Sequence, residues 1–330
     1  GLNNDDIYIV YSGEVIAKGE DGNDDIRSQY NLNNKLYGGL GDDTIRIQHY
    51  STVYWSDTQH ISDKNNNGAL DEISFNYIDG GEGDDHLIFY GQNTYTHYGR
   101  VETEIDGGDG DDIIKVTDNY AGSTTNSDGN RYGIAKVTID SGEGDDEITV
   151  SGGLDISITT GSGSDVISLT AKQYRTLVEG ARNIRNENES SEVVDVKPIY
   201  ITDFTTGESG DVLDYGDLLR NGTLEYDGSN PFATGFLSLE QEGNDTLMRF
   251  DADGSSKEEK SSIIVAVLEN VSKDSLVANN FNPNFPPDGS AASPQTIDGT
   301  YLSDELTGGF GDDTISGLEG NDTIDGQAGS

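Results

Sequence analysis

The residues of this sequence best suited to chemistry are aspartates that recur just after closely spaced glycines. Clear copies of a nine-residue unit, Gly-Gly-x-Gly-Asp-Asp followed by three further residues, begin at Gly38, Gly80, Gly107 and Gly308. Looser copies begin at Gly19, Ser141, Thr160, Gly299 and Gly317, and a damaged copy ends at Ile7. Glycines at positions one, two and four allow a positive φ and let backbone carbonyls approach closely. The aspartate at position six adds a hard carboxylate oxygen.

Stacked copies of this unit would place carboxylates side by side. Two unit charges 4 Å apart repel by about 4 kcal/mol at an effective dielectric constant near 20, so a counter-ion is required. The available donors are carboxylate and carbonyl oxygens, and the chain contains no cysteine. Oxygen donors in a flexible arrangement favour Ca²⁺, which accepts six to eight of them. The unit therefore predicts several Ca²⁺ ions.

The overall composition agrees with a cation requirement. The 330 residues include 62 acids and 19 lysines and arginines, for a formal net charge of −43, and only 32% of the residues are hydrophobic. Such a chain gains little from apolar burial alone. Its field excludes binding of nucleic acid or an acidic membrane surface. The longest apolar run, 263–268, is too short to cross a bilayer, and nothing resembles a signal peptide. Both ends of the chain lie within repeat units, so we expect it to be part of a longer protein.

The elements that position the aspartates are short strands. Position eight is Ile or Leu in every copy, so positions seven to nine predict a strand with one core-facing side chain. Position four falls at residues 3, 22, 41, 83, 110, 144 and 163. The steps between these residues predict stacked coils with the motif on one edge only. The longer steps predict loops inserted at the other edge, such as 118–131.

The unit resembles the Ca²⁺-binding nonapeptide of repeats-in-toxin (RTX) proteins. The resemblance implies an all-β fold, a parallel β-roll in which one turn gives oxygens from positions one, three and five. A turn one coil further on gives oxygens from positions two, four and six. An ion between the second and third copies would then use Gly19, Asp21 and Asn23 with Gly39, Gly41 and Asp43. Extended to all copies, the implied metal ligands are Asp5, Gly19, Asp21, Asn23, Asp24, Gly39, Gly41, Asp42, Asp43, Gly81, Gly83, Asp84, Asp85, Gly108, Gly110, Asp111, Asp112, Gly142, Gly144, Asp145, Asp146, Gly161, Gly163, Asp165, Asp304, Gly309, Gly311, Asp312, Asp313, Asn321 and Asp322.

A second candidate cation loop lies within the insertion after the third copy. Residues 63–72 resemble the first part of an EF-hand loop, with candidate ligands Asp63, Asn65, Asn67, Asp71 and Glu72. Position twelve of that pattern is Ser74, and Glu72 is its candidate substitute. The segment is either a Ca²⁺ site or a plain asparagine-rich loop.

The sequence divides into four segments. Residues 1–170 predict the roll with its inserted loops, and 171–280 resemble the capping β segment that follows RTX blocks in type I-secreted proteins. Within that cap, Asp203 and Asp211 are candidate ligands of a last ion, with an ordinary turn as the alternative. Residues 281–296 predict a linker, and 297–330 predict the start of a second, truncated roll.

No catalytic signature accompanies the repeats. The histidines form no HExxH motif, and no GxSxG is present. We expect a non-catalytic Ca²⁺-binding segment of a large secreted bacterial surface protein, an adhesin or a surface-layer or filament protein. The resemblance implies export by type I secretion machinery. Its partner would be a cell surface or glycan, without nucleic acid or membrane insertion. Alternatives are the accessory C-terminal module of an extracellular enzyme, and a carbohydrate- or ice-binding module.

Overall fold

The computed structural model describes residues 3–10, 14–29, 33–50, 73–92, 100–118, 133–153, 155–185, 197–223, 226–254, 262–291, 294, 296–308 and 313–326. The EF-hand-like segment 63–72 and the ligand candidates Gly309, Gly311 and Asp312 lie outside these residues. Within them, no helix is long and apolar enough to span a membrane.

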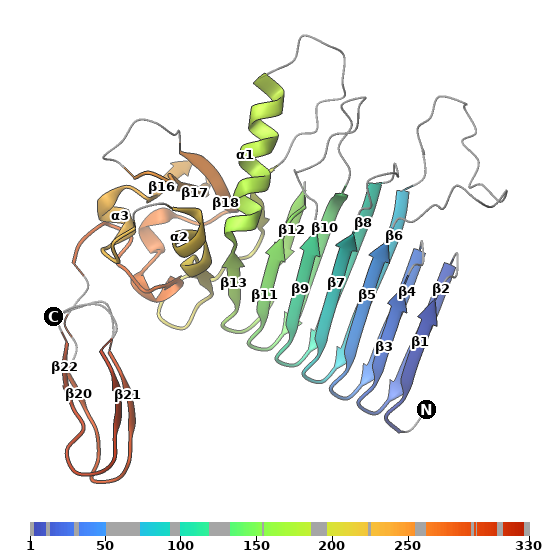
Figure 1. Ribbon diagram of the computed structural model, residues 1–330, viewed down its shortest axis with the longest axis horizontal. Helices are drawn as coiled ribbons and strands as arrows, with labels where there is room; N and C mark the ends of the chain where they lie inside the picture. The colour runs from blue at the N-terminus through green and yellow to red at the C-terminus, as the bar shows by residue number, and fades with distance from the viewer. Residues whose placement is uncertain are drawn as a thin grey trace.

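Two long sheets form the main body, and consecutive strands alternate between them (Figure 1). The first sheet contains β1 (Asp6–Val10), β3 (Asp25–Gln29), β5 (Thr44–Tyr50), β7 (His86–Gln92), β9 (Ile113–Asp118), β11 (Glu147–Ser151), β13 (Val166–Leu169), β15 (Val212–Asp214) and β19 (Phe281–Asn282). The second contains β2 (Glu14–Asp21), β4 (Asn33–Leu40), β6 (Ile73–Glu82), β8 (Arg100–Asp109), β10 (Gly133–Glu143), β12 (Ile156–Thr159), β14 (Ile199–Ile201), β18 (Ile263–Leu268), β17 (Asp245–Phe250) and β16 (Leu237–Glu242). Pairing is parallel up to β18, so the chain is an all-β parallel β-roll.

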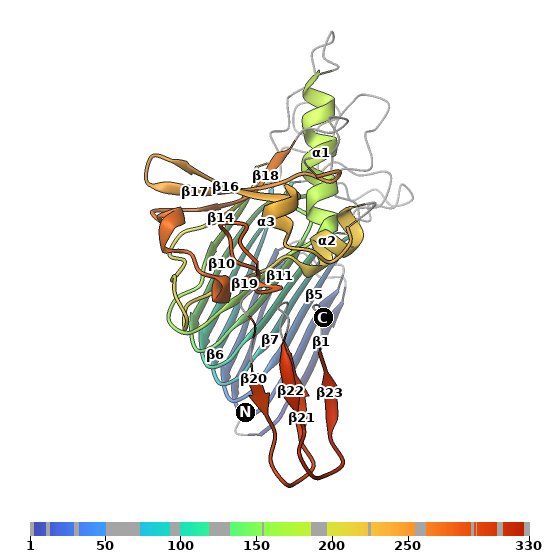
Figure 2. The ribbon, with the colours of Figure 1, turned by 90° about the vertical axis from the view of Figure 1, so that its left-hand side faces the viewer.

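The core lies between the two sheets, which face each other as layers (Figure 2). Position eight of the unit supplies one layer, and the residues there are almost completely buried: Ile26, Ile45, Leu87, Ile114, Ile148 and Ile167. The second sheet contributes buried aliphatic side chains such as Leu36, Ile78 and Ile139. The alternation of inward and outward residues along each strand follows from the period of two.

A mixed α and β cap closes the roll at its C-terminal end. It contains α1 (Ala171–Arg185), α2 (Gly216–Gly222), α3 (Pro231–Thr234) and two short 3₁₀ turns, Lys273–Ser275 and Ala278–Asn280, around an antiparallel arrangement of β16, β17 and β18. The predicted β capping segment, 171–280, therefore also contains helices. The predicted linker also starts too early, because β19 pairs with β15 and both Phe281 and Phe285 are buried.

The C-terminal segment forms a separate set of short parallel pairs. Strand β20 (Thr296–Asp298) pairs with β22 (Thr314–Ser316), and β21 (Glu305–Thr307) pairs with β23 (Thr323–Asp325). Alternation between two sheets is repeated here on a smaller scale, as expected for a second roll.

Candidate calcium ladder at the turn edge

All motif turns of the first roll lie along one edge, at the bottom of Figure 1, and the longer insertions connect strands at the opposite edge. Positions two and four adopt a positive φ, for example 125° at Gly39 and 113° at Gly41. Position one does not, yet a β-carbon on Gly38 would lie closer than 3.0 Å to both Asp43 Oδ2 and the Gly80 carbonyl oxygen. Glycine is therefore required at position one by close approach of oxygens and not by its dihedral angle.

The aspartates at position six form a continuous hydrogen-bonded row from coil to coil. The Asp24 amide N–H donates to Asp43 Oδ1 (2.7 Å), and the Asp43 amide N–H donates to Asp85 Oδ1 (2.6 Å). The row continues through Asp112, Asp146, Asp165 and Asp211. The sequence separations along it are irregular, from 19 to 46 residues, but the geometry repeats. Insertions in the chain thus leave the row intact.

In six of these carboxylates, all except that of Asp211, the second oxygen is buried and has no hydrogen-bond partner. The six atoms are Oδ2 of Asp24, Asp43, Asp85, Asp112, Asp146 and Asp165, whose residues are at most 2% exposed. Leaving an ionised oxygen buried without a donor costs far more than an ordinary hydrogen bond returns. Six such atoms in one line are best explained by cations.

Burial without a partner also raises the pKa values of several inner-row aspartates. Burial is the largest cause in each case, and nearby aspartates add to it. The pKa of Asp85 is raised to about 8, that of Asp112 to about 7, and those of Asp43 and Asp146 to about 6. The pKa of Asp165, beside Asp211, is also raised. Without a cation, the folded ladder therefore favours protonated carboxyls near neutral pH.

Backbone carbonyl oxygens lie beside the unpartnered carboxylate oxygens. Together they form an oxygen-lined space between coils, which we call the cradle. Asp24 Oδ2 and the carbonyl of Gly38 converge beside Gly19, and the same pair repeats as Asp85 with the carbonyl of Gly107. The carbonyls of Glu20 and Gly22 point toward the following coil, where they face Gly39 and Gly41. This donor set contains only oxygen, which fits Ca²⁺.

The cradle adds carbonyl oxygens at position one to the ligands that the resemblance implies. The carbonyls of Gly38, Gly80 and Gly107 each lie beside the position-one glycine of the preceding coil, next to an unpartnered aspartate oxygen. Their signal in the sequence is the glycine at position one, which leaves room for the oxygens. The ion that the resemblance places between the second and third copies stays a prediction.

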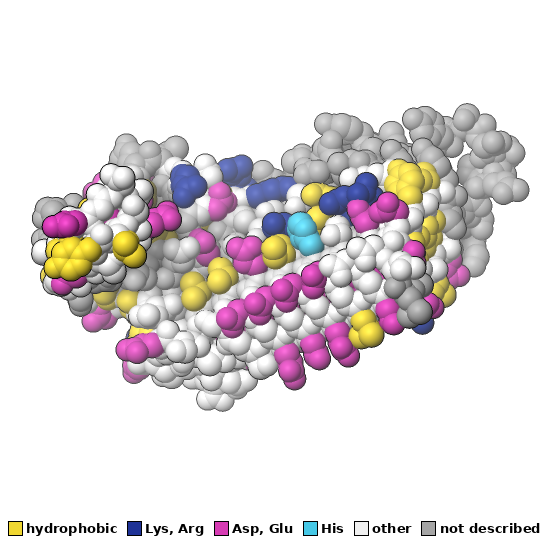
Figure 3. All heavy atoms as spheres, turned by 90° about the horizontal axis from the view of Figure 1, so that it is seen from below, with side chains coloured by type: hydrophobic (Ala, Val, Ile, Leu, Met, Phe, Trp, Pro, Cys, Tyr) yellow, Lys and Arg dark blue, Asp and Glu magenta, His cyan; other side chains and the backbone are white. Residues whose placement is uncertain are grey.

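The aspartates at position five form a second, exposed row running in the opposite direction. The Asp84 amide N–H donates to Asp42 Oδ1 (3.2 Å), and the Asp111 amide N–H donates to Asp84 Oδ1 (2.9 Å). Asp145 and Ser164 continue it. Rows of acidic side chains are visible along this edge in Figure 3. These aspartates are exposed, so this row adds negative potential beside the buried cradle.

The cap ends the ladder with hydrogen bonds. Both oxygens of Asp203 accept amide protons, from Thr160 (2.8 Å) and Gly161 (2.9 Å). Asp211 Oδ2 accepts from the Thr205 amide (2.7 Å). Neither carboxylate has an unpartnered oxygen, so the structure favours the turn interpretation of this pair over the ion site.

The other predicted ligands are distributed as follows. Asp5 begins the inner row through its amide, which donates to Asp24 Oδ1 (2.6 Å), and Asp21 is exposed at the end of β2. In the second roll, the Asp304 amide donates to Asp322 Oδ1 (3.1 Å), and Asp313 Oδ2 lies close to Gly308 and the Gly326 carbonyl. Among the described residues, no group of three or more His, Cys, Asp or Glu side chains is close enough to hold a metal. The sites rely on carbonyl oxygens instead.

Comparison with known families agrees with this geometry. The model of the RTX calcium-binding nonapeptide repeat matches the chain in four copies, within residues 31–46, 74–94 and 298–330. No curated protein matches the chain significantly. The fold and the turn ladder define a parallel β-roll, and within the matched residues the chain carries RTX Ca²⁺-binding nonapeptide repeats. The nonapeptide repeats of this family bind Ca²⁺.

Proposed function

We propose that this chain is a non-catalytic, Ca²⁺-dependent structural segment of a large secreted bacterial surface protein, an adhesin or a surface-layer or filament protein. The proposal is supported mainly by the six buried aspartate oxygens that have no hydrogen-bond partner. Each lies in a gap between successive coils, so the first roll would hold about six ions. These aspartates accept hydrogen bonds from the neighbouring coil, so we assign them a structural role and not a catalytic one.

The same ladder supports a proposal for how the protein reaches its place of action. At low Ca²⁺ the buried carboxylates oppose folding, and the acidic chain stays extended enough for a type I secretion channel. Outside the cell, Ca²⁺ binding to the folded state stabilises it. Each site contributes about 2.7 kcal/mol when Ca²⁺ is at one hundred times its dissociation constant. Several sites together exceed the stability of a typical domain.

The test is Ca²⁺-dependent folding followed by circular dichroism and limited proteolysis. In EDTA we expect a largely unfolded, protease-sensitive chain, and Ca²⁺ should produce the β spectrum cooperatively. Mg²⁺ demands a tighter octahedral shell, so the same concentration should not replace Ca²⁺. A chelated chain that stays compact and resistant to protease contradicts the proposal. So does equal folding in Mg²⁺.

A further inference from the structure

The two outer faces of the same three coils differ sharply in charge. On the first sheet, strands β5, β7 and β9 have nine residues in register on the side away from the core: Thr44, Arg46, Gln48, His86, Ile88, Tyr90, Ile113, Lys115 and Thr117. Ile88, in the middle of this set, is only 3% exposed. We call these nine residues the basic face. It contains no acid, although 62 of the 330 residues are acidic. The patch thus carries net positive charge through Arg46 and Lys115, in a chain whose formal net charge is −43.

The opposite face of these coils is acidic. Strands β6, β8 and β10 present Phe75, Tyr77, Asp79, Glu102, Glu104, Asp106, Lys136, Thr138 and Asp140 in register. We call these the acidic face. Asp79, Asp106 and Asp140 lie opposite one another on adjacent strands, an arrangement that destabilises a sheet. Tyr77 donates a hydrogen bond to Asp79 (3.2 Å), but no lysine or arginine among the described residues forms an ion pair with these three.

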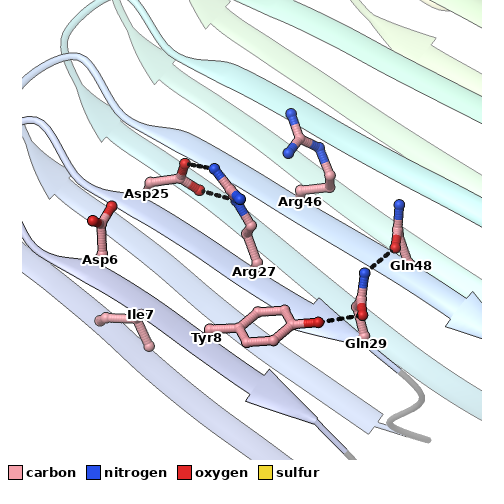
Figure 4. Close-up of a pocket in the computed structure, with 8 residues that line it drawn as sticks. All are labelled: Asp6, Ile7, Tyr8, Asp25, Arg27, Gln29, Arg46 and Gln48. Atoms are coloured by element: carbon pink, nitrogen blue, oxygen red, sulfur yellow. Dashed lines mark hydrogen bonds and ion pairs between the residues drawn. The ribbon is translucent and has the colours of Figure 1, made fainter.

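The basic face contains one arginine, Arg46, that could bind a carboxylate of another molecule. Arg27 is engaged by Asp25 through two hydrogen bonds, whereas Arg46, one strand further on, has no acid partner among the described residues (Figure 4). Arg46 borders a hollow of about 560 Å³ on the outer surface of β1, β3 and β5. Lysine and arginine side chains gather on one side of the acidic rows in Figure 3. Arg46 could therefore bind such a carboxylate.

We infer that the basic face of one copy of this chain packs against the acidic face of a second copy. Both faces belong to the same coils, so they have the same strand spacing and similar dimensions. Contact between two different faces does not close on itself, and each added copy leaves one face of each kind free. The assembly would therefore be a row of rolls. This inference rests on the proposed function only in that the chain must be folded with Ca²⁺.

The large net charge does not prevent this contact. At about 0.15 M salt the Debye length is about 8 Å, so the overall charge of −43 is largely screened between copies. Opposite charges in contact at the interface lie well within that length. Ca²⁺ bound at the turn edge further lowers the net charge. The association should therefore be weak but specific.

The test is sedimentation of the full Ca²⁺-loaded chain at about 0.15 M salt. The wild type should show a weight-average mass that rises with concentration beyond that of a dimer. R46E/K115E disables the basic face, and E102K/E104K disables the acidic face. Each variant alone should remain monomeric. A mixture of the two should associate again, because one intact face of each kind remains and the two altered faces carry new charges of opposite sign.

A charge-matched control separates this contact from general electrostatics. R220E/K273E reverses two exposed cations in the cap and should assemble like the wild type. Circular dichroism with Ca²⁺ tests first whether every variant folds. A failure of Ca²⁺-dependent folding is thereby distinguished from a failure of self-association. A wild type that stays monomeric, a mixture that stays monomeric, or equal loss of assembly in the control would overturn the inference. Binding of a carboxylated polysaccharide to the basic face without self-association would also overturn it.

Discussion

The glycine at position one of the unit leaves room for two oxygens that converge. Gly80 lacks a positive φ, yet a β-carbon there would lie within 3.0 Å of Asp85 Oδ2 and the Gly107 carbonyl. We expect Gly80→Ala to push these oxygens apart and to raise the Ca²⁺ midpoint of folding about tenfold, equivalent to about 1.4 kcal/mol. Gly326→Ala is the control, since nothing lies within 4 Å of its β-position. Equal effects of both changes in a Ca²⁺ titration would contradict this role.

The two aspartates of one turn should differ in their effect on Ca²⁺. Asp112 is buried with an unpartnered Oδ2, whereas Asp109 is exposed three residues earlier. Asp112→Asn removes a charged ligand and should lower the number of bound ions measured by calorimetry. Asp109→Asn should leave that number unchanged. It should shift the Ca²⁺ midpoint of folding only slightly, because it removes one negative charge near the site. Loss of the same number of ions in both variants would argue against the inner row as the metal site.

At the scale of the elements, the cap depends on one buried side chain. Asn280 Oδ1 accepts from the amides of Gly207 (3.0 Å) and Val277 (3.1 Å), and its Nδ2 donates to the Asp211 carbonyl (2.9 Å). Asn280→Ala leaves several buried polar groups unpaired, at about 1–3 kcal/mol each. We expect a clear fall in the thermal midpoint with Ca²⁺ present. Asn282→Ala, which removes an exposed hydrogen bond to Asp214 (2.8 Å), should change it little.

The elements that could be predicted are those set by local periodicity. The aliphatic residue at position eight of each unit predicted the core-facing strands. Ile45 and Ile114, which occupy that position, are completely buried, as predicted. The helix Ala171–Arg185 was not predicted, because the resemblance of 171–280 implied a β segment. Prolines suggested a linker from 281, but burial of Phe281 and Phe285 anchors that segment to the cap. The sequence could identify the ligand types, but not which way a carbonyl points between coils.

At the scale of the whole molecule, the ladder ties coils that are distant in sequence into one unit. Asp43 and Asp85 are separated by 42 residues but joined by one hydrogen bond, and an ion in the same gap would add several more contacts. Each coil touches only its neighbours, so stability passes along the roll from gap to gap. The cap ends this series through Asp203 and Asp211, whose oxygens are all hydrogen-bonded. Folding should therefore depend cooperatively on Ca²⁺.

The response of the whole molecule to pH should reverse sign with Ca²⁺. In the Ca²⁺-free folded state the pKa of Asp85 is raised to about 8 and that of Asp112 to about 7, against about 3.9 in an unfolded chain. The folded state then binds more protons than the unfolded state between about pH 4 and 8, so acidification stabilises it. With Ca²⁺, the same protons compete for the ligands. In EDTA, circular dichroism should show a larger folded fraction at pH 5 than at pH 8, while the Ca²⁺ midpoint of folding should be higher at pH 5. If acid lowered stability in EDTA as well, the buried carboxylates would not be the groups that oppose folding.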